Sequence, residues 1–421
     1  MALKRRAFIK RGVTFVSLTL ATNHMMMQTS NAGDSVFAQA SNLSDNRRML
    51  IVVQLQGGND GLNTVVPYSD GRYFDARPTL AVAAEDVLPL DSQFGLNPQL
   101  TQFKSLFDQG KLAVVQGVGY PNPNRSHFRS TDIWETANPQ TVVGTGWLGN
   151  FLDQSIATNH AEELRAVSVG KSLPLTLRGQ QVVVPSIASL ESFQFQTNER
   201  FPEDRNAQLK AFTAIQEATS ATGSGYRSTV AGTGLSALRS AGAIQQAASH
   251  YSSTVDYPNN PFGKGLQLIA KLISGGLGTQ IMHVTIGGFD THSQQAKTHT
   301  ELLRAVDGGL GALYEDLGQL GIADDVLLMS FSEFGRRVKE NGSQGTDHGT
   351  AAPMFVLGNG AQGGLYGQQP GLGKNDLDKN GDLLFQVDFR CVYSTVLESW
   401  LGVDPADVLG QRFENLGFVG G

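Results

Sequence analysis

Two side chains suited to metal binding, Asp290 and His292, stand two residues apart just after an apolar run at residues 281–286. Side chains of an extended backbone alternate with a period of two, so both can point to one side and share a metal ion. On a helix the same spacing would send the two side chains in divergent directions. A carboxylate and an imidazole at this position therefore indicate metal chemistry.

Two more carboxylates follow apolar runs in the same way. Asp60 comes shortly after residues 49–55, and Glu333 comes shortly after residues 326–331. An aspartate after a Gly-Gly turn is on its own more often a turn residue than a ligand. Because an acidic residue follows each of these three apolar runs, we expect Asp60 and Glu333 to belong to the same site as Asp290.

A second imidazole can reach this site through a loop. His348 follows a polar, glycine-containing segment at residues 336–346 and precedes an apolar run at residues 353–357. Such a loop can fold the histidine back toward the strand ends. The predicted ligand set is Asp60, Asp290, His292, Glu333 and His348. This mixture of carboxylates and imidazoles suits one or two divalent ions of zinc, manganese, magnesium or calcium.

The elements that must position these residues are strands that alternate with helices. Four apolar runs have the length and character of strands buried on both faces of a sheet: residues 49–55, 112–116, 281–286 and 326–331. Helical periodicity occurs between them, at residues 100–107 and 302–317. This alternation predicts an α/β fold, a three-layer α/β/α sandwich with a mostly parallel sheet. Ligands of such folds bind at the carboxyl ends of the strands.

One segment of the chain has a different composition. Residues from about 180 to 278 are rich in Ala, Ser, Gly, Thr and Gln and contain no acidic residue at the end of a strand. We expect a helical insertion that caps or flanks the sheet. The prediction for residues 41–421 is therefore one domain that carries this insertion.

Composition and charge exclude several classes of protein. Hydrophobic residues make up 40% of the 421 residues and charged residues 17%, which favours a folded chain with a sizeable core. Residues 1–40 hold five basic residues and one acidic residue, so the net charge of −6 becomes −10 without them. An acidic protein repels phosphate backbones, and nucleic acid is therefore not an expected partner. A single cysteine, Cys391, excludes a disulfide within the chain.

The first forty residues are typical of a targeting segment. Arg5 and Arg6 are followed by an apolar pair and Lys10, a pattern that resembles the twin-arginine export motif. The apolar run at residues 13–21 is shorter than the roughly 20 residues that span a bilayer, and Ala38-Gln39-Ala40 offers a cleavage site. We predict export by the twin-arginine translocation machinery to the periplasm or the extracellular space, with no stable membrane span after cleavage.

Five ordered motifs carry a resemblance to a known family. The chain resembles domain-of-unknown-function family 1501, a group of twin-arginine-exported bacterial proteins that is similar to the alkaline phosphatase and sulfatase superfamily. The motifs are Gly57-Gly58-Asn59-Asp60-Gly61, Arg125-Ser126-His127-Phe128, Gly288-Phe289-Asp290-Thr291-His292, Ser332-Glu333-Phe334-Gly335-Arg336 and Gly345-Thr346-Asp347-His348-Gly349. The resemblance implies an alkaline phosphatase-like fold over nearly all of the chain beyond residue 40.

The resemblance also implies a metal centre with two ions. Asp60 would be the aspartate of the first strand that binds a metal, and Asp290, His292 and His348 would be later ligands. The chain departs from the superfamily pattern at Glu333-Phe334, where an Asp-His pair is usual. Phe334 cannot bind a metal, so one site is weakened or the chain holds a single ion.

Roles around the reacting group follow from the same resemblance. Ser126 fits the place of the nucleophile at the start of a helix, where backbone N–H groups favour a bound anion. Arg125 and Arg336 would clamp a tetrahedral anion, since a guanidinium can bind one through two parallel hydrogen bonds. His127 would act as a metal ligand or as an acid.

Two functions of different class remain open from the sequence. The first is hydrolysis of a small-molecule or polymer-borne phosphate or sulfate ester, with a metal-activated hydroxyl as nucleophile. The alternative is a non-catalytic protein of the cell envelope that binds a metal or another ligand on the same scaffold, because a fold alone does not establish catalysis.

Overall fold

The computed structural model describes residues 48–156, 164–191, 193, 204–222, 225–249 and 251–420. The predicted export segment at residues 1–40 lies outside these ranges. None of the described helices combines the length and the apolar character needed to cross a lipid bilayer.

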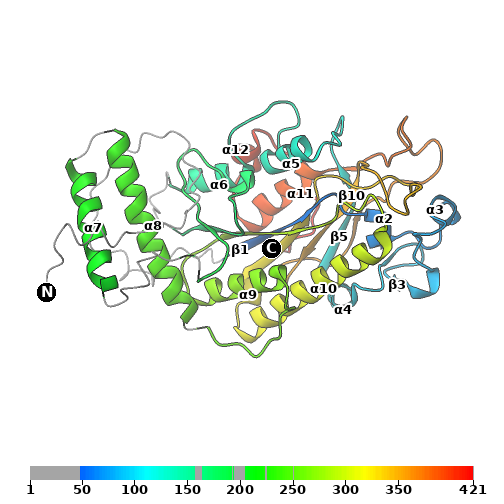
Figure 1. Cartoon of the computed structure of the whole chain (residues 1–421). Coiled ribbons are helices and arrows are strands. Elements are labelled where there is room, and N and C mark those ends of the chain that lie inside the picture. The colour runs from blue at the N-terminus through cyan, green and yellow to red at the C-terminus, as the bar shows by residue number, and fades with distance from the viewer. Residues whose placement is uncertain are drawn as a thin grey trace.

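A central sheet of nine strands runs through the described part of the chain (Figure 1). Its strands are β1 (Met49–Gln56), β5 (Leu112–Gly119), β6 (Ala166–Val169), β7 (Ser186–Ile187), β8 (Ile281–Gly287), β9 (Val326–Phe331), β10 (Ala352–Leu357), β11 (Gly364–Gly367) and β12 (Val387–Asp388). Their order is β11-β5-β10-β9-β1-β8-β6-β7, with β12 also paired to β5. β10 is antiparallel to both of its neighbours, whereas the other pairs are parallel. The predicted mostly parallel sheet is confirmed.

Helices cover both faces of this sheet, as Figure 1 shows. Along β1, Ile51 and Val53 belong to one apolar cluster and Leu50 and Val52 to the other, because neighbouring residues of a strand face opposite sides. One face packs against α4 (Thr101–Asp108), α9 (Pro261–Ser274) and α10 (Gln295–Gln319). The other face packs against α5 (His127–Thr136), α6 (Trp147–Ile156), α11 (Phe389–Thr395), the π-helical turn Val396–Trp400 and α12 (Pro405–Leu409). The three-layer arrangement is therefore confirmed.

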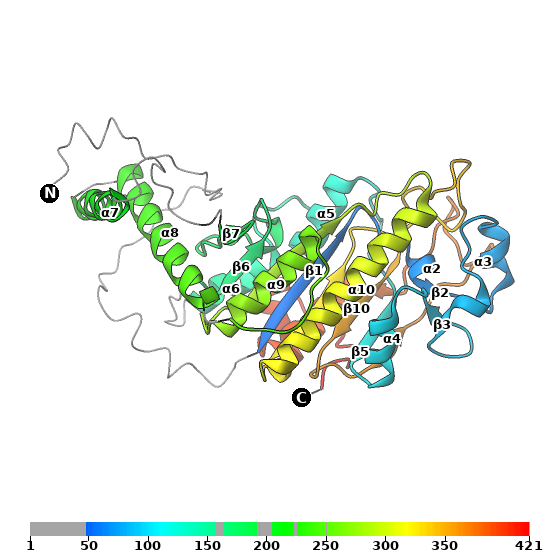
Figure 2. The ribbon, with the colours of Figure 1, turned by 60° about the horizontal axis from the view of Figure 1, so that its bottom comes forward.

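The segment predicted as an insertion contains three helices in the described residues. α7 (Arg205–Thr222) and α8 (Tyr226–Ser249) form a pair that projects from one end of the sandwich (Figure 2). α9 instead lies beside α10 and adds Leu266 and Ile269 to the core. Of the three helices, α9 is part of a helical layer, whereas the α7–α8 pair extends away from the sandwich.

A small lobe joins the sheet at the end of β1. It holds α2 (Gly61–Thr64), α3 (Gly71–Ala76) and a second sheet of β2 (Val65–Val66), β3 (Leu88–Pro89) and β4 (Gly95–Leu96). Leu62, Val66 and Tyr73 form its apolar core.

Short 3-10 helices occur in the small lobe at Ala84–Asp86 and elsewhere in the chain at Leu175–Leu177 and Ala323–Asp325.

The order of the strands brings the predicted site residues to one edge. β1, β8 and β9 are parallel neighbours, so their carboxyl ends lie together. β10 runs the other way, and its first residue, Ala352, therefore lies at the same edge. His348, which precedes β10, reaches that edge although its strand is antiparallel.

Candidate metal centre

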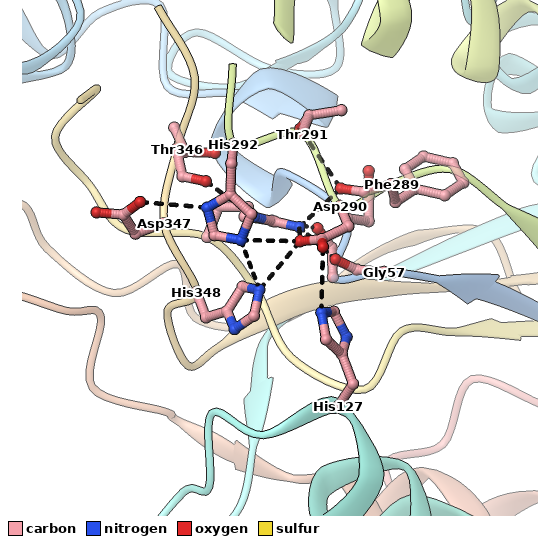
Figure 3. A network of polar contacts seen from close by, with 12 residues as sticks. Gly57, His127, Phe289, Asp290, Thr291, His292, Thr346, Asp347 and His348 are labelled. Atoms are coloured by element: carbon pink, nitrogen blue, oxygen red, sulfur yellow. Dashed lines mark hydrogen bonds and ion pairs between the residues drawn. The ribbon is translucent and has the colours of Figure 1, made fainter. Parts of the chain in front are cut away.

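The carboxylate of Asp290 is the hub of a cluster of imidazoles (Figure 3). Its Oδ1 atom lies 3.0 Å from Nε2 of His292 and 3.0 Å from Nε2 of His348. Its Oδ2 atom lies 3.4 Å from Nε2 of His127. The two Nε2 atoms of His292 and His348 are themselves 3.0 Å apart. Ligand atoms of His127, Asp290 and His348 all lie within 4.8 Å of one another.

Each imidazole is held from behind at its Nδ1 atom. Nδ1 of His127 lies 2.9 Å from Oε1 of Glu333, and Nδ1 of His292 lies 3.2 Å from Oδ1 of Asp347. Nδ1 of His348 lies 2.8 Å from the backbone carbonyl of Arg125. These three partners are acceptors, so the proton of each neutral ring is assigned to Nδ1.

This assignment has a direct chemical consequence for the Nε2 atoms. In the neutral rings they carry lone pairs, and they face the oxygens of an ionised carboxylate. Acceptors repel one another at 3.0 Å unless a cation lies between them or the rings are protonated. Histidines bound to a metal nearly always donate their other ring N–H to a carboxylate or a carbonyl. Three imidazoles and one carboxylate also form a ligand set that suits zinc.

Electrostatics favour the ionised form of the hub. Partial burial opposes ionisation of Asp290, but the hydrogen bond and the positive charge of Arg336 hold the pKa of this carboxyl well below its ordinary value. A hydrogen bond from Asn341 lowers the pKa of Asp347 against a smaller opposing effect of burial, and a hydrogen bond from His292 lowers it further. Both carboxylates are therefore charged at neutral pH and attract a cation.

A buried aromatic ring forms one wall of the cluster. The ring centroid of Phe334 lies 5.0 Å from that of His127 and 4.5 Å from that of His348. Gly58, with φ of +81°, faces this ring so closely that an added Cβ would meet Cε2 of Phe334 at 2.4 Å. The turn after β1 therefore needs glycine, and the apolar wall limits the movement of two imidazoles.

Glu333, a predicted ligand, lies behind His127 and is fully buried. Its Oε1 atom also accepts the backbone N–H of Gly57 at 2.9 Å. Its Oε2 atom has no hydrogen-bond partner among the described residues. Through its contact with Nδ1, Glu333 can fix the orientation of the His127 ring.

Asp60, also a predicted ligand, lies apart from the imidazoles. Its Oδ2 atom accepts a hydrogen bond of 2.6 Å from Nη1 of Arg77, and both side chains are fully buried. Burial opposes the ionisation of Asp60, yet Arg77 keeps its pKa below the ordinary value. Asp60 thus faces a guanidinium that belongs to the small lobe.

Arg336, a predicted clamp for an anion, is buried beneath the cluster. It donates to the carbonyl of Gly58 at 2.7 Å, to that of Thr346 at 2.8 Å and to that of Phe289 at 2.8 Å. It also donates to Oδ1 of Asp290 at 2.8 Å. Arg336 therefore ties together the loops that follow β1 and β8 and the loop that precedes β10.

Arg125 and Ser126 lie at the start of α5, next to His127. The guanidinium of Arg125 pairs with Asp378, at 3.3 Å, and with Asp382. Ser126 is the N-cap residue of α5, is exposed, and makes no capping hydrogen bond with its side chain. Its backbone N–H donates to Oδ1 of Asn124 at 2.8 Å.

Sequence reasoning did not identify several residues that support this cluster. Asp347 stands directly before His348 in the motif Gly345-Thr346-Asp347-His348-Gly349. Its position next to a predicted ligand is the signal that could have identified it. Arg77 lies 16 residues after the motif that ends at Gly61, and Gln295 lies three residues after the motif that ends at His292. Nothing in the sequence marks either residue as a partner of Asp60.

Solved structures offer distant comparisons. The periplasmic domain of EcEptC from Escherichia coli, solved in complex with zinc, is 10% identical; the match covers 76% of this chain and 74% of that one, with a TM-score of 0.35. A protein of the alkaline phosphatase superfamily from Vibrio parahaemolyticus is 10% identical over 87% of this chain and 70% of that one, with a TM-score of 0.37. The PsFucS1 sulfatase from Pseudoalteromonas sp. is 10% identical over 88% and 73%, with a TM-score of 0.37.

Comparison at the level of sequence gives a clearer result. No curated protein matches the sequence significantly. A family model described as "Protein of unknown function (DUF1501)" matches residues 113–412, which is most of the chain. The chain belongs to this family, as its motifs predicted.

Proposed function

We propose that the chain is an exported, metal-dependent enzyme that hydrolyses phosphate or sulfate esters. The observation that carries the proposal is the convergence of three imidazole Nε2 atoms on Asp290, while each Nδ1 atom is held from behind. Asp290, His127, His292 and His348 are the proposed ligands. Glu333 and Asp347 are proposed to orient two of these rings.

The chain supplies the remaining groups around the reacting ester. Ser126 is the proposed nucleophile, because its exposed hydroxyl stands at the N-terminus of α5 and next to His127. The positive end of this helix favours the negative charge of a phosphate or sulfate group. A divalent cation, when bound, lowers the pKa of a neighbouring hydroxyl and stabilises charge on the transferring group.

The place of action in this proposal is the periplasm or the extracellular space. Residues 1–40, with their paired arginines and short apolar run, support export in the folded state by the twin-arginine machinery. A folded protein can carry its ion across the membrane. Protein for the tests below is therefore best purified after export by its native route.

Turnover with defined metals tests the proposal. The protein is stripped with a chelator, reloaded with zinc, manganese, magnesium or calcium, and assayed on aryl phosphates, phosphodiesters and aryl sulfates. We expect one metal to restore turnover of one ester class, and Ser126→Ala to lower kcat by more than about 1000-fold. Ser105→Ala, which removes an exposed hydroxyl on α4, is the matched control and should leave kcat unchanged.

A specific observation favours the non-catalytic alternative. Both arginines predicted to clamp an anion already have partners, because Arg125 faces Asp378 and Asp382 and Arg336 faces backbone carbonyls and Asp290. A protein that binds a metal or another ligand in the envelope needs no such clamp. Tight metal binding without turnover of any ester in the panel would support this alternative.

A further inference from the structure

Asp60 and Asp290 follow neighbouring parallel strands, and a pair of acids at such a position could hold a second ion between them. Their surroundings differ sharply. Asp290 is about half exposed and faces imidazoles, whereas the side chain of Asp60 is fully buried and faces Arg77. The contacts of Asp60 therefore decide how many ions the centre can hold.

Both oxygens of Asp60 are already in use. Oδ1 accepts the backbone N–H of Asn63 at 3.4 Å, and Oδ2 accepts hydrogen bonds from Arg77 at 2.6 Å and from Nε2 of Gln295 at 2.5 Å. A metal ion at Oδ2 would have to displace Arg77 and Gln295, and the guanidinium bonded to the same carboxylate would repel an ion at Oδ1.

Arg77 is fixed in place by its other contacts. Its Nη1 atom also donates to Oδ1 of Asn63 at 2.6 Å, its Nε atom to the carbonyl of Val338 at 2.9 Å and its Nη2 atom to the carbonyl of Arg337 at 2.9 Å. The side chains of Arg77 and Asp60 are both fully buried. The guanidinium therefore supplies a permanent positive charge where a second ion would otherwise bind.

A neutral layer separates Asp60 from the imidazole cluster. Oε1 of Gln295 accepts hydrogen bonds from Thr291 at 3.0 Å and from Thr346 at 2.6 Å. Thr291 stands between Asp290 and His292 in sequence, and all three neutral side chains are buried. The layer of Gln295, Thr291 and Thr346 keeps the two carboxylates from sharing one cation.

We infer that the centre binds one divalent cation, and that the Arg77 guanidinium takes the place of a second ion at Asp60. This inference rests on the proposed metal function of the Asp290 cluster. It departs from the two-ion centre that the family resemblance implies. The difference arises because a positive side chain from the small lobe already neutralises the acid after β1.

Counting bound ions tests the inference. Exported full-length wild-type protein is loaded with zinc, manganese or calcium, freed of loose metal by gel filtration and analysed by inductively coupled plasma mass spectrometry. The charge-neutral double variant Asp60→Asn/Arg77→Gln and the single variant Asp290→Asn are treated in the same way, and circular dichroism checks their folding.

We expect one ion per chain in wild-type protein, one in the double variant and none in Asp290→Asn. Two ions in wild-type protein, falling to one in the double variant, would overturn the inference and leave the proposed function standing. No retained ion in wild-type protein would instead overturn the proposed function itself. If the double variant does not fold, the wild-type count decides alone, since one ion supports the inference and two contradict it.

Discussion

Nε2 of His292 lies 3.0 Å from Nε2 of His348, and each ring is anchored at Nδ1 by a different acceptor. Two ring nitrogens with lone pairs do not rest at this distance without a positive charge nearby. Arg336 reaches Asp290 but neither imidazole in the described residues. This close approach of the two rings supports the cation proposed to lie between them.

Glu333 offers a test of the groups behind the ligands. Glu333→Gln keeps the size of the side chain but removes the charge that orients His127. We expect metal affinity to fall by about 10- to 100-fold, as is usual when such an outer partner is lost. Competition with a fluorescent chelator measures the change. Glu301→Gln, an exposed change on α10, should leave affinity unchanged.

The buried ion pair of Asp60 and Arg77 predicts a large loss of stability on mutation. Arg77→Met leaves a buried carboxylate without its partner, so the free energy of unfolding should fall by about 3–5 kcal/mol. Urea denaturation measures this change. The exposed pair of Arg412 and Asp404 has the same 2.6 Å separation, and Arg412→Gln should have little effect. If both variants lowered the free energy of unfolding equally, burial of the Asp60–Arg77 pair would not be the cause of the loss.

The turn after β1 predicts a coupled loss of stability and metal affinity. Gly58→Ala places a Cβ against Phe334 at a backbone angle that favours glycine. We expect displacement of Phe334 and of the two imidazoles beside it, with metal affinity lowered about tenfold or more. Calorimetric titration with zinc checks this result. Gly71→Ala, where an added Cβ meets nothing within 4 Å, is the control.

Glu135 predicts a pH dependence of stability. Burial raises the pKa of this carboxyl from 4.5 to about 7, so the folded protein holds a proton that the unfolded chain releases. The stabilising contribution is complete below about pH 4.5 and is lost as pH rises through about 7. Glu135→Gln keeps an acceptor for the N–H of Leu175 and lacks this loss. Relative to wild type, its free energy of unfolding should therefore rise by roughly 3 kcal/mol across that range; an unchanged difference would contradict the assignment.

Much of the fold was predictable because it depends on local patterns. The strands β1, β5, β8 and β9 appear in the sequence as short continuous apolar runs, and the helices α4 and α10 appear as apolar stripes with helical periodicity. Their alternation led to the mostly parallel sheet and its two helical layers. The antiparallel direction of β10 and the small lobe after β1 were not predicted, because strand pairing is a long-range property.

The candidate site was predictable only for residues that directly follow or precede a predicted strand, because the ends of these strands meet at one edge of the sheet. Asp290, His292 and His348 were expected at one edge of the sheet, and they lie together there; their role as ligands stays a prediction. The partner of Asp60 was not predictable, since Arg77 comes from a lobe with no motif of its own. The contact between Glu333 and Nδ1 of His127 was also not predictable, because it requires the first residue of α5 to lie beside the end of β9.

Anomalous X-ray scattering from crystals grown with zinc tests the proposed centre most directly. We predict a single strong peak about 2.0–2.2 Å from a carboxylate oxygen of Asp290 and from Nε2 of His348, with His127 and His292 beside it. Crystals that show no peak at this cluster, or a peak only at other residues, would contradict the metal centre and the ester chemistry proposed for it.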